Sequence, residues 1–313
     1  MIATIVNRLV LSIPVLFGVL VLGFALVQLA PGDPARVMAG PMAPPEVVER
    51  IREQMGLDRP MIVQFTGYLG RVLQGDLGRS LISNKTVLSE LGDAIVPTVE
   101  LMVACLIWSI PLGIAMGTLA AVWRGSLVDR AIMAFSVAGV SLPIFFICLV
   151  LIQLFGVYWQ LFPFIGRGGP LWTEQGLRHI ALPALSLGLI FIGPVARMTR
   201  SSVLEVLRLD HVRTARAKGL SERAVILRHG LRNALIPVVT LVGLQAGYLL
   251  GGAVVTETIF SYPGIGRLAV GAILSSDFPL AQGAILVLAL AFIVINMIVD
   301  VLYALLDPRV QRR

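Results

Sequence analysis

The residue types that bind phosphate, coordinate metal ions or act as nucleophiles are few in this sequence, and their spacing matches no common catalytic motif. Its two lysines, Lys85 and Lys218, do not follow a glycine as the lysine of a phosphate-binding loop does. The three histidines, His179, His211 and His229, lack the spacing of metal ligands. Neither Gly-x-Ser-x-Gly nor His-Glu-x-x-His occurs. We therefore expect no catalytic residue, no metal site and no cofactor held by this chain, and we do not expect an enzyme.

The composition indicates an integral membrane protein. Of 313 residues, 57% are hydrophobic and 14% are charged, and the mean hydropathy is +0.89. A soluble domain has about 45–50% apolar and about 25% charged residues, so a disordered chain and an ordinary soluble enzyme are both excluded. The net charge of +7 does not indicate nucleic acid as a partner, because the arginines cluster beside apolar runs rather than among aromatic residues.

Six apolar runs are long enough to cross a bilayer, which takes about 20 helical residues. They cover residues 9–30 and approximately 95–123, 131–155, 180–200, 234–256 and 281–305. The first run is longer than the core of a signal peptide, so we expect a retained helix. Cys105 and Cys148 lie inside apolar runs and are interpreted as small buried hydrophobes. The fold class is predicted to be an all-α membrane protein with six transmembrane helices.

Basic residues in the short loops predict which side of the membrane each loop faces. With the N-terminus inside, fifteen basic residues lie on the inner side, nine of them between Arg197 and Arg232. Only Arg167, Arg178 and Arg267 lie in the short outer loops. Both termini are therefore predicted to face the cytoplasm, with membrane lipid around the helices.

The long loop after the first span is predicted to form a small helical region outside the membrane. Glu46 to Gly56 has apolar residues at helical spacing, preceded by Pro44–Pro45, and a second helix is expected over roughly Pro60 to Leu73. We therefore divide the chain into an N-terminal end with the first span (1–30), an extracytoplasmic helical region (31–93), a five-helix core (94–306) with a cytoplasmic loop (201–232), and a cytoplasmic tail (307–313).

The cytoplasmic loop between the fourth and fifth spans is too long for a passive connector. Residues 201–209 are expected to continue the fourth helix, Asp210 to cap a short helix over His211 to Lys218, and Gly219 to end it. Ser221 is expected to cap a further helix that ends at Arg228. Thr214, Ala215 and Ala217 are predicted to present small side chains to a partner's groove. The alternative is a basic loop attracted to anionic lipid headgroups.

Polar and small residues within the spans are candidates for a substrate pathway. Gly243, Gly247 and Gly251 recur every four residues, which permits close helix packing, pathway lining or both. Gln245 shares this span. Glu100 and Asp300 are carboxylates near span ends; Glu100 is expected either to pair with a neighbouring element or to line the pathway, and Asp300 to be structural.

Residues 213–219, Arg-Thr-Ala-Arg-Ala-Lys-Gly, resemble the coupling-loop motif of ABC importer permeases of the dipeptide/oligopeptide type. Arg213-Thr214-Ala215 stands where the motif has Glu-Ala-Ala, and the motif's distal proline is displaced to Pro237. Four further segments resemble the same family along nearly the whole chain: residues 29–34 (Leu-Ala-Pro-Gly-Asp-Pro), 75–80 (Gly-Asp-Leu-Gly-Arg-Ser), 256–264 (Thr-Glu-Thr-Ile-Phe-Ser-Tyr-Pro-Gly) and 306–309 (Leu-Asp-Pro-Arg).

This resemblance implies a type I ABC importer bundle in a bacterial cytoplasmic (inner) membrane. It implies a second homologous permease, two ABC ATPase subunits that bind ATP and Mg, and an extracytoplasmic substrate-binding protein. The residues expected to couple to the ATPase are His211, Arg213, Thr214, Ala215, Arg216, Ala217, Lys218 and Gly219, and the pathway candidates are Glu100, Gln245, Gly247 and Gly251.

The expected substrates are short peptides, with glutathione or a nickel chelate as alternatives on the same architecture. A secondary carrier that works without ATP is a distant alternative. Such carriers often show internal repeats and ionisable residues at the membrane midplane, whereas this sequence has no clear repeat and its carboxylates lie near span ends. A passive membrane anchor would leave the elaborate inner loop unexplained.

Overall fold

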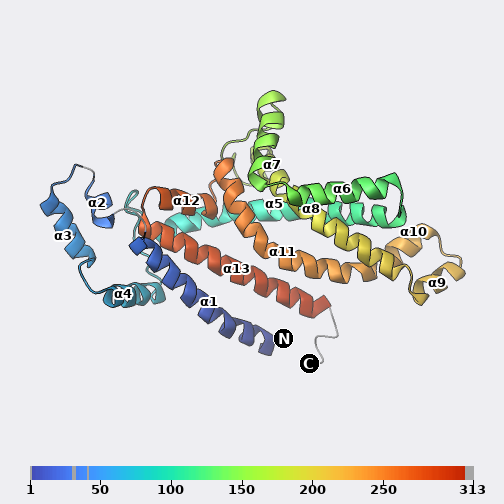
Figure 1. Cartoon of the computed structure of the whole chain (residues 1–313), viewed down its shortest axis with the longest axis horizontal. Helices are drawn as coiled ribbons and strands as arrows, with labels where there is room; N and C mark the ends of the chain where they lie inside the picture. Colours follow the sequence, from blue (N-terminus) through green and yellow to red (C-terminus); the bar gives the residue numbers. More distant parts are fainter. Residues whose placement is uncertain (1, 30–32, 41, 307–313) are drawn as a thin grey trace. The chain divides into compact units, whose positions relative to one another are not determined.

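The computed structural model describes residues 2–29, 33–40 and 42–306, and most of these residues are helical (Figure 1). In chain order the helices are α1 (Ile2–Leu29), α2 (Pro34–Ala39), α3 (Pro45–Met55), α4 (Met61–Leu73), α5 (Val87–Val122), α6 (Leu127–Ser141), α7 (Ile144–Leu151), the π-helical segment η1 (Ile152–Tyr158), α8 (Glu174–Val206), α9 (Asp210–Ala217), α10 (Glu222–Ala224), the π-helical segment η2 (Val225–Leu231), α11 (Arg232–Ile259), α12 (Ile265–Leu274) and α13 (Phe278–Leu306). The predicted all-α fold is confirmed.

Within the described residues, five helical segments are long and apolar enough to cross a membrane. They are Arg8–Ala25, Val87–Val122, Glu174–Val206, Glu222–Ile259 and Phe278–Val299. A sixth crossing exists only if α6 and the helix over Ile144–Tyr158 count as one broken span, because the two are bent by 106°. The number of spans is therefore as predicted if this pair is counted once, but the single helix expected over approximately residues 131–155 is broken into two.

Proline explains the break between α6 and α7. Pro143 has no N–H to donate, and its ring disfavours helical geometry at the preceding residue. Leu142 accordingly adopts an extended conformation, with φ −83° and ψ 131°. α6 packs along α8, whereas α7 turns away from α6 and contacts both α8 and α11 (Figure 1).

The chain forms two compact units. Among the described residues, the N-terminal unit comprises the chain within Ile2–Val99 and Ser261–Val294, and the central unit comprises Glu100–Phe260 together with residues 295–306. α5 and α13 are shared: the first part of each helix belongs to the N-terminal unit and the rest belongs to the central unit. The division of the chain by membrane sidedness stays a prediction, and the tail at 307–313 lies outside the described residues.

Two glycines on α5 allow it to approach α8 closely within the central unit. A Cβ atom built on Gly113 would lie 2.8 Å from Val195 Cγ1, and one built on Gly117 would lie 2.6 Å from Thr199 Cβ. Such distances leave no room for a side chain, so the Gly-x-x-x-Gly spacing places two helix backbones in contact. Glycine spacing in the sequence pointed to the fifth span, and this pair in the second span was not predicted.

The helical region after the first span is confirmed in the N-terminal unit. α3 ends at Gly56, whose φ of +67° is the left-handed geometry that glycine adopts without strain. α4 follows Pro60 and packs Tyr68 against Leu20 of α1 and Leu286 of α13. α2 was not predicted; it begins after Asp33, whose carboxylate accepts the Ala35 N–H at 3.0 Å.

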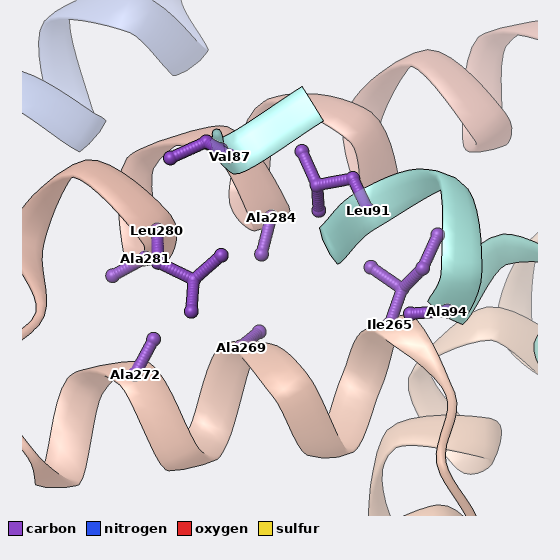
Figure 2. Packing of buried hydrophobic residues seen from close by; sticks show 9 residues of the cluster. All are labelled: Val87, Leu91, Ala94, Ile265, Ala269, Ala272, Leu280, Ala281 and Ala284. Carbon is purple, nitrogen blue, oxygen red and sulfur yellow. The ribbon is translucent and has the colours of Figure 1, made fainter. Parts of the chain in front are cut away.

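α12 was also not predicted, and it builds the second hydrophobic cluster of the N-terminal unit (Figure 2). Side chains from the start of α5, from α12 and from the start of α13 meet there: Val87, Leu91, Ala94, Ile265, Ala269, Ala272, Leu280, Ala281 and Ala284. Beside it the buried Ser80 hydroxyl donates to Asp277 Oδ2 at 2.5 Å, and Thr98 Oγ1 accepts the Ile265 N–H at 2.9 Å. These bonds fix the α12 segment to the chain around α5.

Candidate coupling loop and translocation residues

α9 is a two-turn helix at the end of the long helix α8. α8 continues to Val206, close to the predicted extension, and α9 then covers Asp210–Ala217. Asp210 was predicted to cap this helix, and this is wrong: Leu209 occupies the cap position with extended geometry, and Asp210 is the first helical residue. Gly219 ends the helix as predicted, because its φ of +78° is the left-handed geometry that suits glycine.

One face of α9 is anchored in the protein. Val212 and Ala215 are buried with Val203 of α8, Val225 of η2 and Ala121 of α5 in a cluster of the central unit. Ala215 is only 5% exposed, so the expectation that it presents a small side chain to a partner is wrong. The spacing of Val212 and Ala215, three residues apart, gives an apolar stripe on a helix, and this stripe faces inward.

The opposite face of α9 is available to a partner. Helical periodicity places Arg213, Thr214 and Ala217 away from Val212, and all three are exposed, as are His211 and Lys218. Arg213 also lies 3.6 Å from the Asp210 carboxylate. The face thus combines a positive charge with small side chains at its centre.

Arg216 forms an ion pair with another residue of this chain, Glu222. Its Nε lies 2.7 Å from Glu222 Oε1, and its Nη2 lies 3.3 Å from Glu222 Oε2. The hydrogen bond to Glu222 raises the pKa of the Arg216 guanidinium, with the charge of Glu222 adding to the effect. The ion pair spans the turn at Gly219.

The segment after this turn leads without interruption into the fifth span. Ser221 caps α10 as predicted, since its hydroxyl accepts the Ala224 N–H at 3.4 Å. The separate helix expected to end at Arg228 is wrong, because α10, η2 and α11 run on as one helix from Glu222 to Ile259. The Asn233 amide donates to the His229 carbonyl at 3.2 Å and lies 3.3 Å from His211 Nε2. α9 and the start of α11 therefore touch through polar groups as well as apolar ones.

The glycines of α11 do not form a single functional face. A Cβ on Gly243 would collide with the Val299 side chain of α13, so this glycine serves close packing. Gly247 is buried and Gln245 is half-buried. Gly251 is exposed, and among the described residues no atom lies within 4 Å of a Cβ built on it.

Two buried carboxylates of the central unit are paired with arginines. Glu100 is 8% exposed and accepts two hydrogen bonds from Arg167, at 2.9 Å from Nε and 2.7 Å from Nη2. Asp129 of α6 binds Arg200 of α8 in the same way, at 2.6 and 2.7 Å. Glu100 thus has a structural partner, while a role in the pathway stays a prediction. The side chain of Asp300 lies outside the described residues.

Metal ligation is not suggested by the positions of the described side chains. Within residues 2–29, 33–40 and 42–306, no three His, Cys, Asp or Glu residues are grouped so that they could hold a metal ion.

The central unit combines helices that are long and apolar enough to cross a membrane with a short helix, α9, that is anchored on one face and exposed on the other. These features are those of a membrane-embedded protein with a surface open to a partner. Residues 109–312 match the family described as the inner membrane component of binding-protein-dependent transport systems, and residues 1–102 match the N-terminal part of such membrane components. The chain belongs to this family of ABC importer permeases, as its motifs predict.

Relatives and a solved structure agree with this assignment. The chain is 45% identical over 307 residues to the glutathione transport system permease protein GsiC of Escherichia coli strain K12, covering 98% of both chains. The protein of the same name in Salmonella choleraesuis strain SC-B67 matches equally well, at 45% identity over 98% of both chains. The inward-facing MetNI methionine ABC transporter matches 70% of this chain and 97% of its own, with a TM-score of 0.58 at 16% identity. The fold is that of a type I ABC importer permease in the inner membrane.

Proposed function

We propose that this chain is one permease half of an ATP-driven importer that moves small peptides into the cell, with glutathione as the first candidate. The choice of glutathione is supported by relatives that are 45% identical over 98% of the chain and are named as glutathione transport permeases. A linear dipeptide and a nickel chelate are the competing substrates.

The main support for the coupling mechanism is that one face of α9 is buried against the protein while the other face is exposed. Val212 and Ala215 fix one face of α9 to α8, η2 and α5, while Thr214 and Ala217 remain free on the other face. A groove on an ATPase subunit would take up the free face, and movement of the groove would pass through the anchored face to the spans. ATP and Mg would bind and react on the two ATPase subunits, and this chain would supply no catalytic group.

We further propose that α9 and both termini lie in the cytoplasm. Fifteen basic residues of short loops and tails fall on this side and three on the other. The second permease would complete the pathway, and the binding protein would release its ligand at the opposite side.

The test uses the complete transporter, reconstituted with its partner permease, ATPases and binding protein in proteoliposomes. Ala217→Trp places a large side chain on the free face and is expected to abolish ATP-driven uptake of labelled glutathione, while Ala217→Ser as the matched control retains it. Normal uptake by Ala217→Trp at equal protein levels would contradict coupling through α9. Uptake of a dipeptide or a nickel chelate, but not of glutathione, would correct the substrate and leave the coupling intact.

A further inference from the structure

One face of α11 is uncovered along the middle of the helix. Leu244 is 65% exposed, Tyr248 is 79% exposed, and Gly251 is exposed and open. These residues are spaced by four and three positions, so they share one side of the helix. The face carries a large aromatic ring next to a position without a side chain.

The depth of Tyr248 makes its exposure significant. It lies eight residues before the predicted outer end of the span at residue 256, which corresponds to about 12 Å at about 1.5 Å per residue. Half of the hydrocarbon layer is about 15 Å thick, so Tyr248 lies close to the midplane. Tyrosines of membrane proteins are instead concentrated at the two interfaces, where the hydroxyl can reach water.

Among the described residues, no hydrogen bond to the hydroxyl of Tyr248 is found. A phenol placed in acyl chains without a hydrogen bond is costly, since nothing replaces the lost water. An uncovered tyrosine at this depth is therefore expected to face water or a polar ligand rather than lipid.

We propose that Tyr248 lines the substrate pathway and that its hydroxyl forms a hydrogen bond with the polar backbone of the passing substrate. The proposal rests on the proposed import of small peptides, which carry several amide donors and acceptors. Gly251, one turn further along the same face, leaves space for the substrate beside the ring. Gln245, half-buried on a neighbouring side of the helix, is placed to contribute a second polar group.

Access to water is tested with a cysteine at this position in the complete transporter. Cys105 and Cys148 are both fully buried, so the native cysteines of this chain should add little labelling, which is read on this chain alone. Tyr248→Cys is expected to react with a membrane-impermeant thiol reagent about tenfold faster than Ile107→Cys, because thiolates form in water and not in lipid. Ile107 is the control because it is 68% exposed and lies near the middle of the second span. Equal or slower reaction of Tyr248→Cys, as expected if the partner permease or lipid covers this face, would overturn the proposal.

The hydrogen bond is tested separately with Tyr248→Phe, which keeps the ring and removes only the hydroxyl. Loss of one hydrogen bond predicts a KM for uptake that is about three- to tenfold higher. An unchanged KM, measured with the substrate that the transporter actually imports, would overturn the hydroxyl's role. Labelling of Tyr248→Cys does not depend on which substrate is imported, so a wrong substrate assignment and a wrong pathway assignment give different results.

Discussion

Arg216 and Glu222 form a bidentate ion pair across the turn that ends α9, with donor–acceptor distances of 2.7 and 3.3 Å. Gly219, at φ +78°, lies between them. The pair joins the last turn of α9 to the first residue of the helix that runs into the fifth span. It therefore restrains the angle at which α9 presents its free face.

If Arg216 positions α9, its replacement should weaken coupling without preventing assembly. Exposed ion pairs are weak because water screens them, so Arg216→Ala is expected to lower substrate-stimulated ATP hydrolysis only about two- to fivefold. Glu222→Ala should have the same effect, although Glu222 lies outside the motif. The double variant Arg216→Glu/Glu222→Arg should regain most of the activity. Failure of this charge exchange to restore activity, with Glu222→Ala normal, would show that Arg216 contacts the ATPase instead.

Ala215 and Ala217 lie two residues apart on α9 and are expected to respond oppositely to the same substitution. Ala215→Leu places extra atoms in the cluster around Val212 and should cost about 1–3 kcal/mol of stability, seen as a lower melting temperature of the two permease subunits purified without their ATPases. Ala217→Leu should leave the melting temperature unchanged but reduce binding of the ATPase subunits. A normal melting temperature for Ala215→Leu together with lost ATPase binding would mean that Ala215 faces the partner.

Ala215 is buried and Ala217 is exposed, and this difference shows which features of the coupling loop can be predicted from the sequence alone. The motif predicted where the helix lies, and Gly219 predicted where it ends. Glycine adopts the left-handed conformation that ends a helix because it has no side chain, so this feature can be read from the sequence alone. Which alanine faces outward depends on where Val212 finds apolar neighbours, and those come from α5, α8 and η2. The same applies to Glu222, whose partnership with Arg216 is decided by the path of the turn and not by either residue type.

The ion pair between Glu100 and Arg167 predicts a large effect for one arginine and a small effect for another. Arg167→Ala leaves a buried carboxylate without its cation and should cost on the order of 3 kcal/mol. Arg178→Ala is the control, because Arg178 is exposed and lies 3.8 Å from Glu174, a pair worth about 0–1 kcal/mol. Thermal unfolding of the purified transporter compares the two variants.

Uptake by Glu100→Gln/Arg167→Ala then separates the two roles considered for Glu100. If the carboxylate is structural, removing both charges should restore most of the stability and retain transport. A stable double variant that no longer transports would place Glu100 in the substrate pathway.

Close packing of α5 on α8 predicts that Gly117 tolerates no side chain. Gly117→Val would push a branched side chain into the Thr199 side chain and the Ala196 backbone, and should reduce the yield of folded transporter severely. Gly18→Ala is the control, since a Cβ at Gly18 would meet no atom within 4 Å among the described residues. Equal yields of folded protein for Gly117→Val and Gly18→Ala, judged by size-exclusion chromatography, would contradict the packing.

The length of the apolar runs was enough to predict five of the spans. The break at Leu142 and Pro143 could also have been predicted from the sequence, but it was not. Proline disfavours a helical residue before it in any context, but prolines inside α8 and α11 are accommodated without a break of this size. α12 could not be predicted from apolar run length, because its ten residues include Arg267 and are too few for a span. Its position depends on the distant partners Thr98, which binds Ile265, and Ser80, which binds Asp277, and the chain brings these together only when folded.

Coupling through α9 is tested most directly by purifying the tagged chain from its native membrane in mild detergent and identifying what accompanies it by mass spectrometry. We expect a second permease and ABC ATPase subunits, and we expect Ala217→Trp to lose the ATPase subunits while keeping the permease. Recovery of the chain alone, folded and able to transport in liposomes without ATP, would contradict coupling through α9 and indicate an independent carrier.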